Sequence, residues 1–274
     1  AGVIADSECA VDAAWHCCSE LGQGIWPEGI TMTTDLILEL TDVDMQFGGL
    51  KALSGINMQV RRGEFIGIIG PNGAGKTTLF NAVSGVIPPT GGEVRVLGRP
   101  MRGKSPDEYC RLGVSRTFQT PRVFADMTVY DNVRFAHTFG NADKNGAARI
   151  QQVLAAVDMA GSANEIAGSM PPARHRLLEI AMALATSPRL LLLDEVAAGL
   201  TEGEVEDVAK LILRLQGEYD LTVVWIEHAV KTLMKTVQRV AVLNFGQLIA
   251  DGTPDAVASD QKVIDAYLGE EEPA

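Results

Sequence analysis

The sequence of 274 residues has no run of about 18 consecutive apolar residues, so no membrane-spanning helix is expected and any membrane role requires a partner. It is also poor in basic residues: 23 Lys and Arg stand against 35 Asp and Glu, giving a net charge of -12. This balance argues against a nucleic-acid-binding surface, because phosphate backbones require clustered Lys and Arg. Only four cysteines are present, which fits a reducing compartment such as the cytosol.

Residues 1–31 lack a clear hydrophobic period and a basic stretch, so we do not expect a signal peptide there. We expect instead a disordered or loosely attached extension, whose role stays open. Met32 stands just before the first predicted strand, so the functional domain is expected at 32–274. A composition of 46% hydrophobic and 21% charged residues supports a sizeable core in that domain.

A glycine-rich stretch at residues 70–78 matches the phosphate-binding P-loop pattern, G-x-x-x-x-G-K-[ST]. The context fits, because the apolar run 65–69 predicts a buried strand before it and residues 78–83 predict a helix after it. The glycines allow backbone N–H groups to turn toward phosphate oxygens, and the helix N-terminus favours negative charge. We expect Lys76 to reach the β- and γ-phosphates of a nucleoside triphosphate and Thr77 to bind Mg²⁺. The expected nucleotide-binding residues here are Gly70, Pro71, Asn72, Gly73, Ala74, Gly75, Lys76, Thr77 and Thr78.

The remaining pattern predicts an α/β fold with a P-loop NTPase core. Its sheet is expected to be mostly parallel, with an N-terminal antiparallel β portion and a helical lobe inserted at about residues 120–187. Apolar spacing of three and four residues supports the helices, and short apolar or β-branched runs support the strands. Further strands are predicted at 36–40, 57–60, 93–96, 189–193, 222–226, 240–243 and 247–250, and further helices at 147–159, 177–185, 205–215 and 263–268.

Two predicted strands run directly into polar side chains. Leu190–Leu193 leads into Asp194 and Glu195, and the strand 222–226 leads toward His228. In open α/β sheets ligands bind at the carboxyl ends of the strands, where these side chains would meet. We expect Asp194 in the Mg²⁺ shell, Glu195 as the general base and His228 as the group that orients the attacking water. Together with Lys76, Glu195 and His228 form the expected catalytic set.

With these motifs in order, the chain from about Leu36 to Gly269 resembles the nucleotide-binding subunit of ABC transporters. The resemblance implies that Phe47 stacks on adenine. It also implies that Gln119, in the segment 115–119, binds Mg²⁺ or water and relays the nucleotide state to membrane subunits. Residues 198–200 resemble the D-loop of that family, and His228 resembles its switch histidine. The implied cofactors are ATP and Mg²⁺.

A narrower resemblance to ATPases of branched-chain amino acid importers lies in residues 47–50, 116–119, 127–129 and 266–269. Urea and amide importers share much of it, and lipopolysaccharide-export ATPases share less. The resemblance implies an ATP-hydrolysing subunit that energises a membrane importer of branched-chain amino acids or similar small polar solutes. It also implies integral-membrane permease subunits, an indirect periplasmic solute-binding protein, no nucleic acid, and a peripheral place on the cytoplasmic face of the inner membrane. The transported solute stays open.

The chain departs from the family at the signature motif, which aligns with Met170-Pro171-Pro172-Ala173-Arg174 and lacks the family's serine and both glycines. Val196 stands in place of a proline and Thr201 in place of an acidic or Asn residue. Arg174 and Arg176 are either phosphate ligands or part of a solvated helix face. The departure favours a heterodimer with a paralogous ATPase, although a homodimer stays open. Two alternative functions also stay open: a soluble ABC-type ATPase acting on nucleic acid or ribosomes, and a weakly hydrolysing regulatory subunit.

Overall fold

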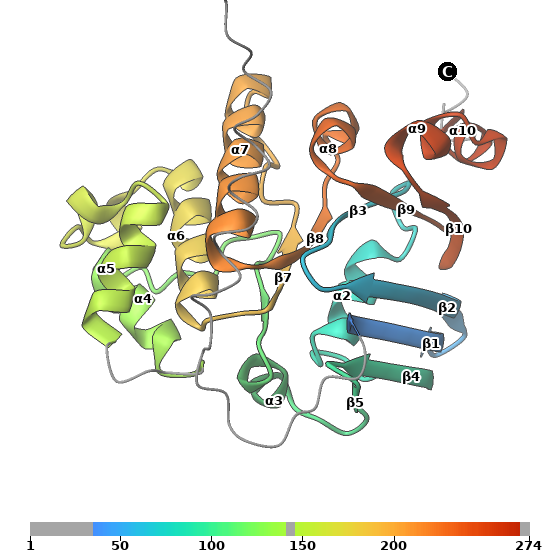
Figure 1. Cartoon of the computed structure of the whole chain (residues 1–274), viewed down its shortest axis with the longest axis horizontal. Helices are drawn as coiled ribbons and strands as arrows, with labels where there is room; N and C mark the ends of the chain where they lie inside the picture. The colour runs from blue at the N-terminus through green and yellow to red at the C-terminus, as the bar shows by residue number, and fades with distance from the viewer. Residues whose placement is uncertain (1–34, 141–145, 269–274) are drawn as a thin grey trace, which may run out of the picture. The chain divides into compact units, whose positions relative to one another are not determined.

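A six-stranded sheet forms the centre of the computed structural model, which describes residues 35–140 and 146–268 (Figure 1). Five of the strands, in the order β9-β3-β8-β7-β6, run parallel, and β10 pairs antiparallel with β9 at the edge. Every residue of β3, β7 and β8 is buried, as expected for parallel strands covered on both faces. The strands span Phe65–Ile69 (β3), Val114–Arg116 (β6), Leu190–Asp194 (β7), Thr222–Ile226 (β8), Arg239–Asn244 (β9) and Gln247–Gly252 (β10).

A second, antiparallel sheet in the order β2-β1-β4-β5 covers one face of the central sheet together with α2 and α3. Leu190, Leu192, Val224 and Ile226 point into the core on this side. The elements are Leu36–Phe47 (β1), Leu50–Arg61 (β2), Gly91–Val96 (β4), Arg99–Pro100 (β5), Lys76–Val83 (α2) and Pro106–Arg111 (α3).

The other face of the central sheet receives Leu191, Leu193, Val223 and Trp225 from alternate positions of the same strands. This core is shared with helices inserted between β6 and β7 and with those that follow β7. In Figure 1, α4, α5 and α6 form a helical lobe that packs away from β1, β2 and β4. The helices are Val129–His137 (α4), Gly146–Ala156 (α5), Pro172–Ala185 (α6), Glu202–Tyr219 (α7), Val230–Thr236 (α8), Pro254–Ala258 (α9) and Gln261–Leu268 (α10), with 3-10 turns at Ala160–Ser162 (η1) and Ala167–Ser169 (η2).

The predicted fold class is confirmed: a mostly parallel core, an antiparallel N-terminal portion and an inserted helical lobe are all present. β1 and β2 are longer than predicted, because their polar outward residues stay in the ladder across a bulge at Asp42, whose φ is 47°. Five short elements, β5, α3, β6, α8 and α9, were not predicted from the sequence, because stretches of two to seven residues are too short to show a hydrophobic period. The predicted extension at 1–31 lies outside the described residues. Within the described part, no helix is both long and apolar enough to cross a bilayer.

Candidate active site

The P-loop connects the carboxyl end of β3 to the first turn of α2. Gly75 precedes this helix with a φ of 102°, and a Cβ there would lie 2.7 Å from the carbonyl oxygen of Ala52, so only glycine fits. Lys76 is buried, and its Nζ donates hydrogen bonds to the carbonyl oxygens of Gly70 at 2.6 Å and Pro71 at 2.9 Å. The loop therefore holds its ammonium group against the curved backbone that follows a central strand.

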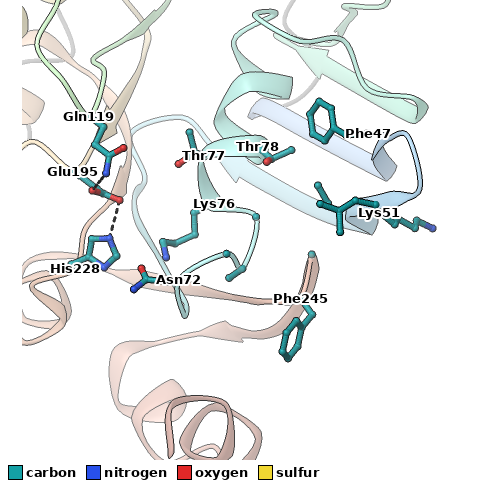
Figure 2. Close-up of a pocket in the computed structure, with 16 residues that line it drawn as sticks. Phe47, Lys51, Asn72, Lys76, Thr77, Thr78, Gln119, Glu195, His228 and Phe245 are labelled. Atoms are coloured by element: carbon teal, nitrogen blue, oxygen red, sulfur yellow. Dashed lines mark hydrogen bonds and ion pairs between the residues drawn. The ribbon is translucent and has the colours of Figure 1, made fainter. Parts of the chain in front are cut away.

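A pocket of about 470 Å³ opens over this loop (Figure 2). Phe47, at the β1–β2 turn, lines it and is 45% exposed, as a side chain that stacks on a base would be. Gly70 and Pro71 contribute carbonyls beneath the loop and do not line the pocket. The lining residues are Phe47, Leu50, Lys51, Ala52, Asn72, Gly73, Ala74, Gly75, Lys76, Thr77, Thr78, Gln119, Glu195, His228, Phe245 and Gly246.

Phe245 is a lining residue that lies between the predicted strands 240–243 and 247–250 and was given no role from the sequence. It occupies the β9–β10 turn with a φ of 43°, and its side chain is 87% exposed. The N–H of Gly246 donates to the carbonyl oxygen of Ala74 at 2.9 Å, which holds this turn beside the P-loop. An aromatic residue in a two-residue turn is unusual and could have marked Phe245 as a candidate functional residue. The sequence does not show, however, that this turn lies beside the pocket.

Glu195 is contacted by two of the other predicted site residues, as Figure 2 shows. Gln119 Nε2 donates to Glu195 Oε2 at 2.7 Å, and His228 Nε2 lies 2.9 Å from Glu195 Oε1. These side chains follow β6, β7 and β8, so the parallel sheet brings their carboxyl ends to one edge. Glu195 is buried and has a φ of 50°, an uncommon conformation for a residue other than glycine. A buried carboxylate held at both oxygens is well ordered to accept a proton from a water molecule.

Asp194, one residue earlier, is 1% exposed and forms an ion pair with Arg116, whose Nη2 lies 2.7 Å from Asp194 Oδ2. Burial raises the pKa of Asp194, although Arg116 acts in the opposite direction. Asp194 Oδ1 is buried and has no hydrogen-bond partner among the described residues. Thr77 and Gln119 line the pocket, whereas Asp194 does not. All three side chains carry oxygen atoms, the donor type that Mg²⁺ prefers. These residues therefore fit the predicted metal, and Arg116 is a partner that the sequence analysis did not identify.

Glu227 is a second buried acid at this edge that the sequence analysis left without a role. Its carboxylate accepts hydrogen bonds from the backbone N–H groups of Ala197 at 3.1 Å and His228 at 3.0 Å. Burial raises the pKa of this group. Glu227 thus ties the segment after Glu195 to the segment that presents His228.

The degenerate segment 170–174 forms the start of α6. Pro171 is the N-cap and Pro172 the first helical residue, positions that suit proline. The N–H groups of Arg174 and His175 both bond to the carbonyl oxygen of Pro171, which leaves Ala173 to supply the backbone donor at this helix end. The substitutions therefore preserve the helix while removing donors from its N-terminus.

The two arginines of this helix differ in their surroundings. Arg174 is part-exposed, with Nη1 4.0 Å from Glu165. Arg176 belongs to neither expected category, because Nη1 donates to the carbonyl oxygen of Glu195 at 2.8 Å and Nη2 to that of Ala198 at 2.6 Å. Thr201, another departure, caps α7 in a reciprocal pair of hydrogen bonds with Glu204.

Comparison with known proteins gives a consistent answer. Residues 53–198, more than half of the chain, match the model of the family described as ABC transporter. The chain belongs to the ABC transporter family. Residues 247–273 also match a model described as branched-chain amino acid ATP-binding cassette transporter.

Relatives of this ABC protein cover nearly its whole domain. The high-affinity branched-chain amino acid transport ATP-binding protein BraF of Pseudomonas aeruginosa is 38% identical over 250 residues, covering 85% of this chain and 98% of BraF. LivG of Escherichia coli, described in the same terms, is 35% identical with the same coverage. The ADP conformation of MJ1267, an ATP-binding cassette of an ABC transporter, superposes with a TM-score of 0.79 at 30% identity, covering 86% of this chain and all of that one. The predicted ABC fold and ATPase activity are confirmed by these matches.

Proposed function

We propose that this ABC ATPase energises the import of branched-chain amino acids or closely similar small polar solutes. The main support from the geometry is the buried Glu195, contacted by Gln119 and His228 beside a P-loop pocket. The substrate class rests on the similarity to BraF and LivG and on the C-terminal match. ATP is consumed in the cytoplasm, so the protein would sit peripherally on the cytoplasmic face of the membrane.

In this proposal the phosphates of ATP lie over the P-loop and the adenine stacks on Phe47. The ammonium group of Lys76 turns from the loop carbonyls toward the β- and γ-phosphates, where its positive charge stabilises the bound nucleotide most strongly. Thr77, Gln119 and Asp194 would hold Mg²⁺, and the buried Oδ1 of Asp194, which has no hydrogen-bond partner among the described residues, supports this assignment. The chemistry that Mg²⁺ supplies at such a site is neutralisation of phosphate charge.

Glu195 then acts as the general base. It accepts a proton from a water molecule whose oxygen attacks the γ-phosphorus, and the bond to the β-phosphate oxygen breaks to give ADP and inorganic phosphate. His228 leaves Glu195 Oε1 to contact the γ-phosphate and orient the water. Gln119 moves with the nucleotide state because it lies at the entry to the helical lobe.

The helical lobe is the proposed docking surface for the permease. Three exposed aromatic side chains lie on it: the ring of Phe135 packs against Phe124, with centroids 4.7 Å apart, and against Phe139, with centroids 5.0 Å apart. Phe124 lies five residues after Gln119 in the chain, so a partner that contacts this aromatic cluster would be linked to the pocket through the segment between them. Cross-links between the chain and co-purified permease should concentrate in this lobe. Links confined to the β9–β10 hairpin would contradict this arrangement.

A paralogous ATPase is the proposed second subunit. Pro171 and Pro172 stand where the family presents a serine hydroxyl and backbone N–H groups to the γ-phosphate bound by the other subunit. Each lost charge-assisted bond is worth roughly 1.5–3 kcal/mol, so a site completed by this segment should be weakened. The chain's own Lys76 and Glu195 remain, so a partner with an intact signature would restore turnover.

The decisive experiment is affinity purification of the chain from its native membranes, followed by ATPase assay with and without the recovered partners. We expect hydrophobic permease subunits and a second ATPase, and faster turnover in their presence. Recovery of RNA instead would favour the nucleic-acid alternative. Very slow single-turnover hydrolysis in the complete complex would favour the regulatory alternative, and robust cooperative hydrolysis by the isolated chain would rule out the proposed heterodimer.

A further inference from the structure

Helix α6 carries two charged side chains one turn apart, the part-buried Arg176 and the buried Glu179, whose hydrogen bonds go to the backbone of two different loops. Arg176 donates to the carbonyl oxygens of Glu195 and Ala198, at 2.8 Å and 2.6 Å. Glu179 Oε1 accepts from the N–H groups of Phe118 at 3.2 Å and Arg122 at 3.1 Å. One helix therefore binds the loop after β7 through a guanidinium group and the loop after β6 through a carboxyl oxygen.

The atoms that α6 holds flank two side chains of the candidate active site. The N–H groups bound by Glu179 lie on either side of Gln119, and a carbonyl bound by Arg176 belongs to Glu195 itself. Gln119 and Glu195 then meet at 2.7 Å. A shift of α6 relative to the sheet would move both backbones and change this contact, while the P-loop, attached to β3 and α2, would stay in place.

The hydrogen bonds to the backbone explain why these two side chains lie where they do. Glu179 is 5% exposed, and a buried carboxylate is tolerated when N–H donors satisfy it. Glu195 adopts a φ of 50°, and a residue in this region needs surrounding contacts to keep it there. Arg176 supplies such a contact on the carbonyl oxygen of that same residue. Both features indicate that hydrogen bonds from α6 fix the backbone on either side of Gln119 and at Glu195.

We propose that Arg176 and Glu179 are positioning residues for hydrolysis: through them, α6 sets the placement of Glu195 and Gln119. This inference rests on the proposed function, in which Glu195 is the base. Because α6 begins at the segment 170–174, contacts made there by a second subunit's nucleotide would reach Glu195 through Arg176. ATP binding to the chain's own P-loop does not depend on this helix.

The test uses the assembled complex and measures kcat and KM for ATP, with nucleotide binding as the check that each variant is folded. Arg176→Met and Glu179→Leu should lower kcat by about tenfold to hundredfold, the range expected for a small misplacement of catalytic groups, with KM changed by less than about threefold. Glu179→Gln keeps an acceptor oxygen and should recover most of the kcat lost in Glu179→Leu. Arg214→Met is the matched control, because Arg214 Nη2 also binds a carbonyl oxygen, that of Ala156 at 2.8 Å, away from the site.

Four outcomes would overturn the inference. The first is an unchanged kcat in both Arg176→Met and Glu179→Leu. The second is a KM raised about tenfold with kcat intact in Arg176→Met, which would make Arg176 a phosphate ligand. The third is an equal loss in Arg214→Met, and the fourth is an equal loss in Glu179→Gln and Glu179→Leu.

Two further measurements keep the test decisive. If Arg176→Met does not fold, Arg176→Lys, which keeps the charge but cannot bridge both carbonyls, should still lower kcat by about threefold to tenfold, and an unchanged kcat would overturn the inference. Glu195→Gln in the same assay separates this inference from the proposed function. Normal turnover in Glu195→Gln would show that the proposed base is wrong, whatever the α6 variants do.

Discussion

Replacing Glu179 by Gln should remove a pH dependence from the stability of the protein. Burial raises the pKa of Glu179 to about 7 from an ordinary value of 4.5, because the loss of water outweighs the N–H groups of Arg122 and Phe118 and the nearby charges of Arg176 and Arg122. Between these two values the folded state keeps a proton on this carboxyl that the unfolded state has released. The free energy of unfolding therefore falls as pH rises through this interval, and changes little from this group below or above it.

The magnitude follows from the separation of the two pKa values. The full shift from 4.5 to about 7 corresponds to about 3 kcal/mol. Between pH 5.5 and pH 8, a range above the sequence pI of 4.8, it corresponds to about 2 kcal/mol. The Gln side chain in Glu179→Gln cannot titrate. The free energy of unfolding of this variant minus that of the unmodified protein should therefore rise by this amount from pH 5.5 to pH 8, whether the difference is positive or negative at pH 5.5.

The assay is urea unfolding at several pH values, followed by tryptophan fluorescence, since Trp225 is fully buried between the sheet and its covering helices. Other buried acids, including Asp194 and Glu227, also contribute to the pH dependence, but they are common to both proteins and cancel in the difference. Glu206→Gln, at an exposed position of α7, is the control and should run parallel to the unmodified protein. Parallel curves for Glu179→Gln would refute the reasoning, because they would show that Glu179 does not retain a proton in the folded state.

Four further predictions concern the pocket and the packing. Lys76→Ala should weaken ATP binding by roughly tenfold to hundredfold, because a buried ammonium facing the phosphates is lost; unchanged affinity by calorimetry would contradict this. Glu195→Gln should keep ATP binding but lower turnover by roughly two to four orders of magnitude, which a single-turnover assay measures; normal turnover would place the base elsewhere. Gly140→Ala should destabilise the fold by about 1–3 kcal/mol, because a Cβ there would lie 2.3 Å from the carbonyl oxygen of Thr186. Gly217→Ala, in α7 with open space around it, should instead stabilise by about 0.5–1 kcal/mol, and equal effects of the two on denaturant midpoints would refute this packing argument.

The features predicted correctly from the sequence are those formed by residues that are consecutive in the chain. The P-loop is a continuous stretch whose glycines and lysine act on one ligand, so its order along the chain is sufficient to recognise it. Buried parallel strands such as β7 and β8 are short apolar runs whose ends are marked by polar residues, and that mark identified Glu195 and His228 as candidates. Long strands with polar outward residues, such as β1, were cut short because alternation is a weaker signal than an apolar run.

The features that sequence analysis missed depend on pairs of residues far apart in the chain. Arg116 meets Asp194 across 78 positions, and Glu179 meets Phe118 across 61. Nothing near Arg176 indicates that its guanidinium binds the carbonyl oxygen of Glu195; by sequence alone it fitted a solvated helix face equally well. Only the packing of α6 against the strand ends selects among these possibilities.

The sequence by itself thus determined the order of the elements, the nucleotide-binding loop and the acids at the strand ends, because these features depend only on the properties of consecutive residues. The tertiary structure alone decided which side chains share the pocket, which buried charges are satisfied by backbone groups, and that Phe245 reaches the nucleotide site. Those outcomes depend on distances between segments that meet only when the sheet is assembled, and a buried charge acquires its partner and its pKa only there.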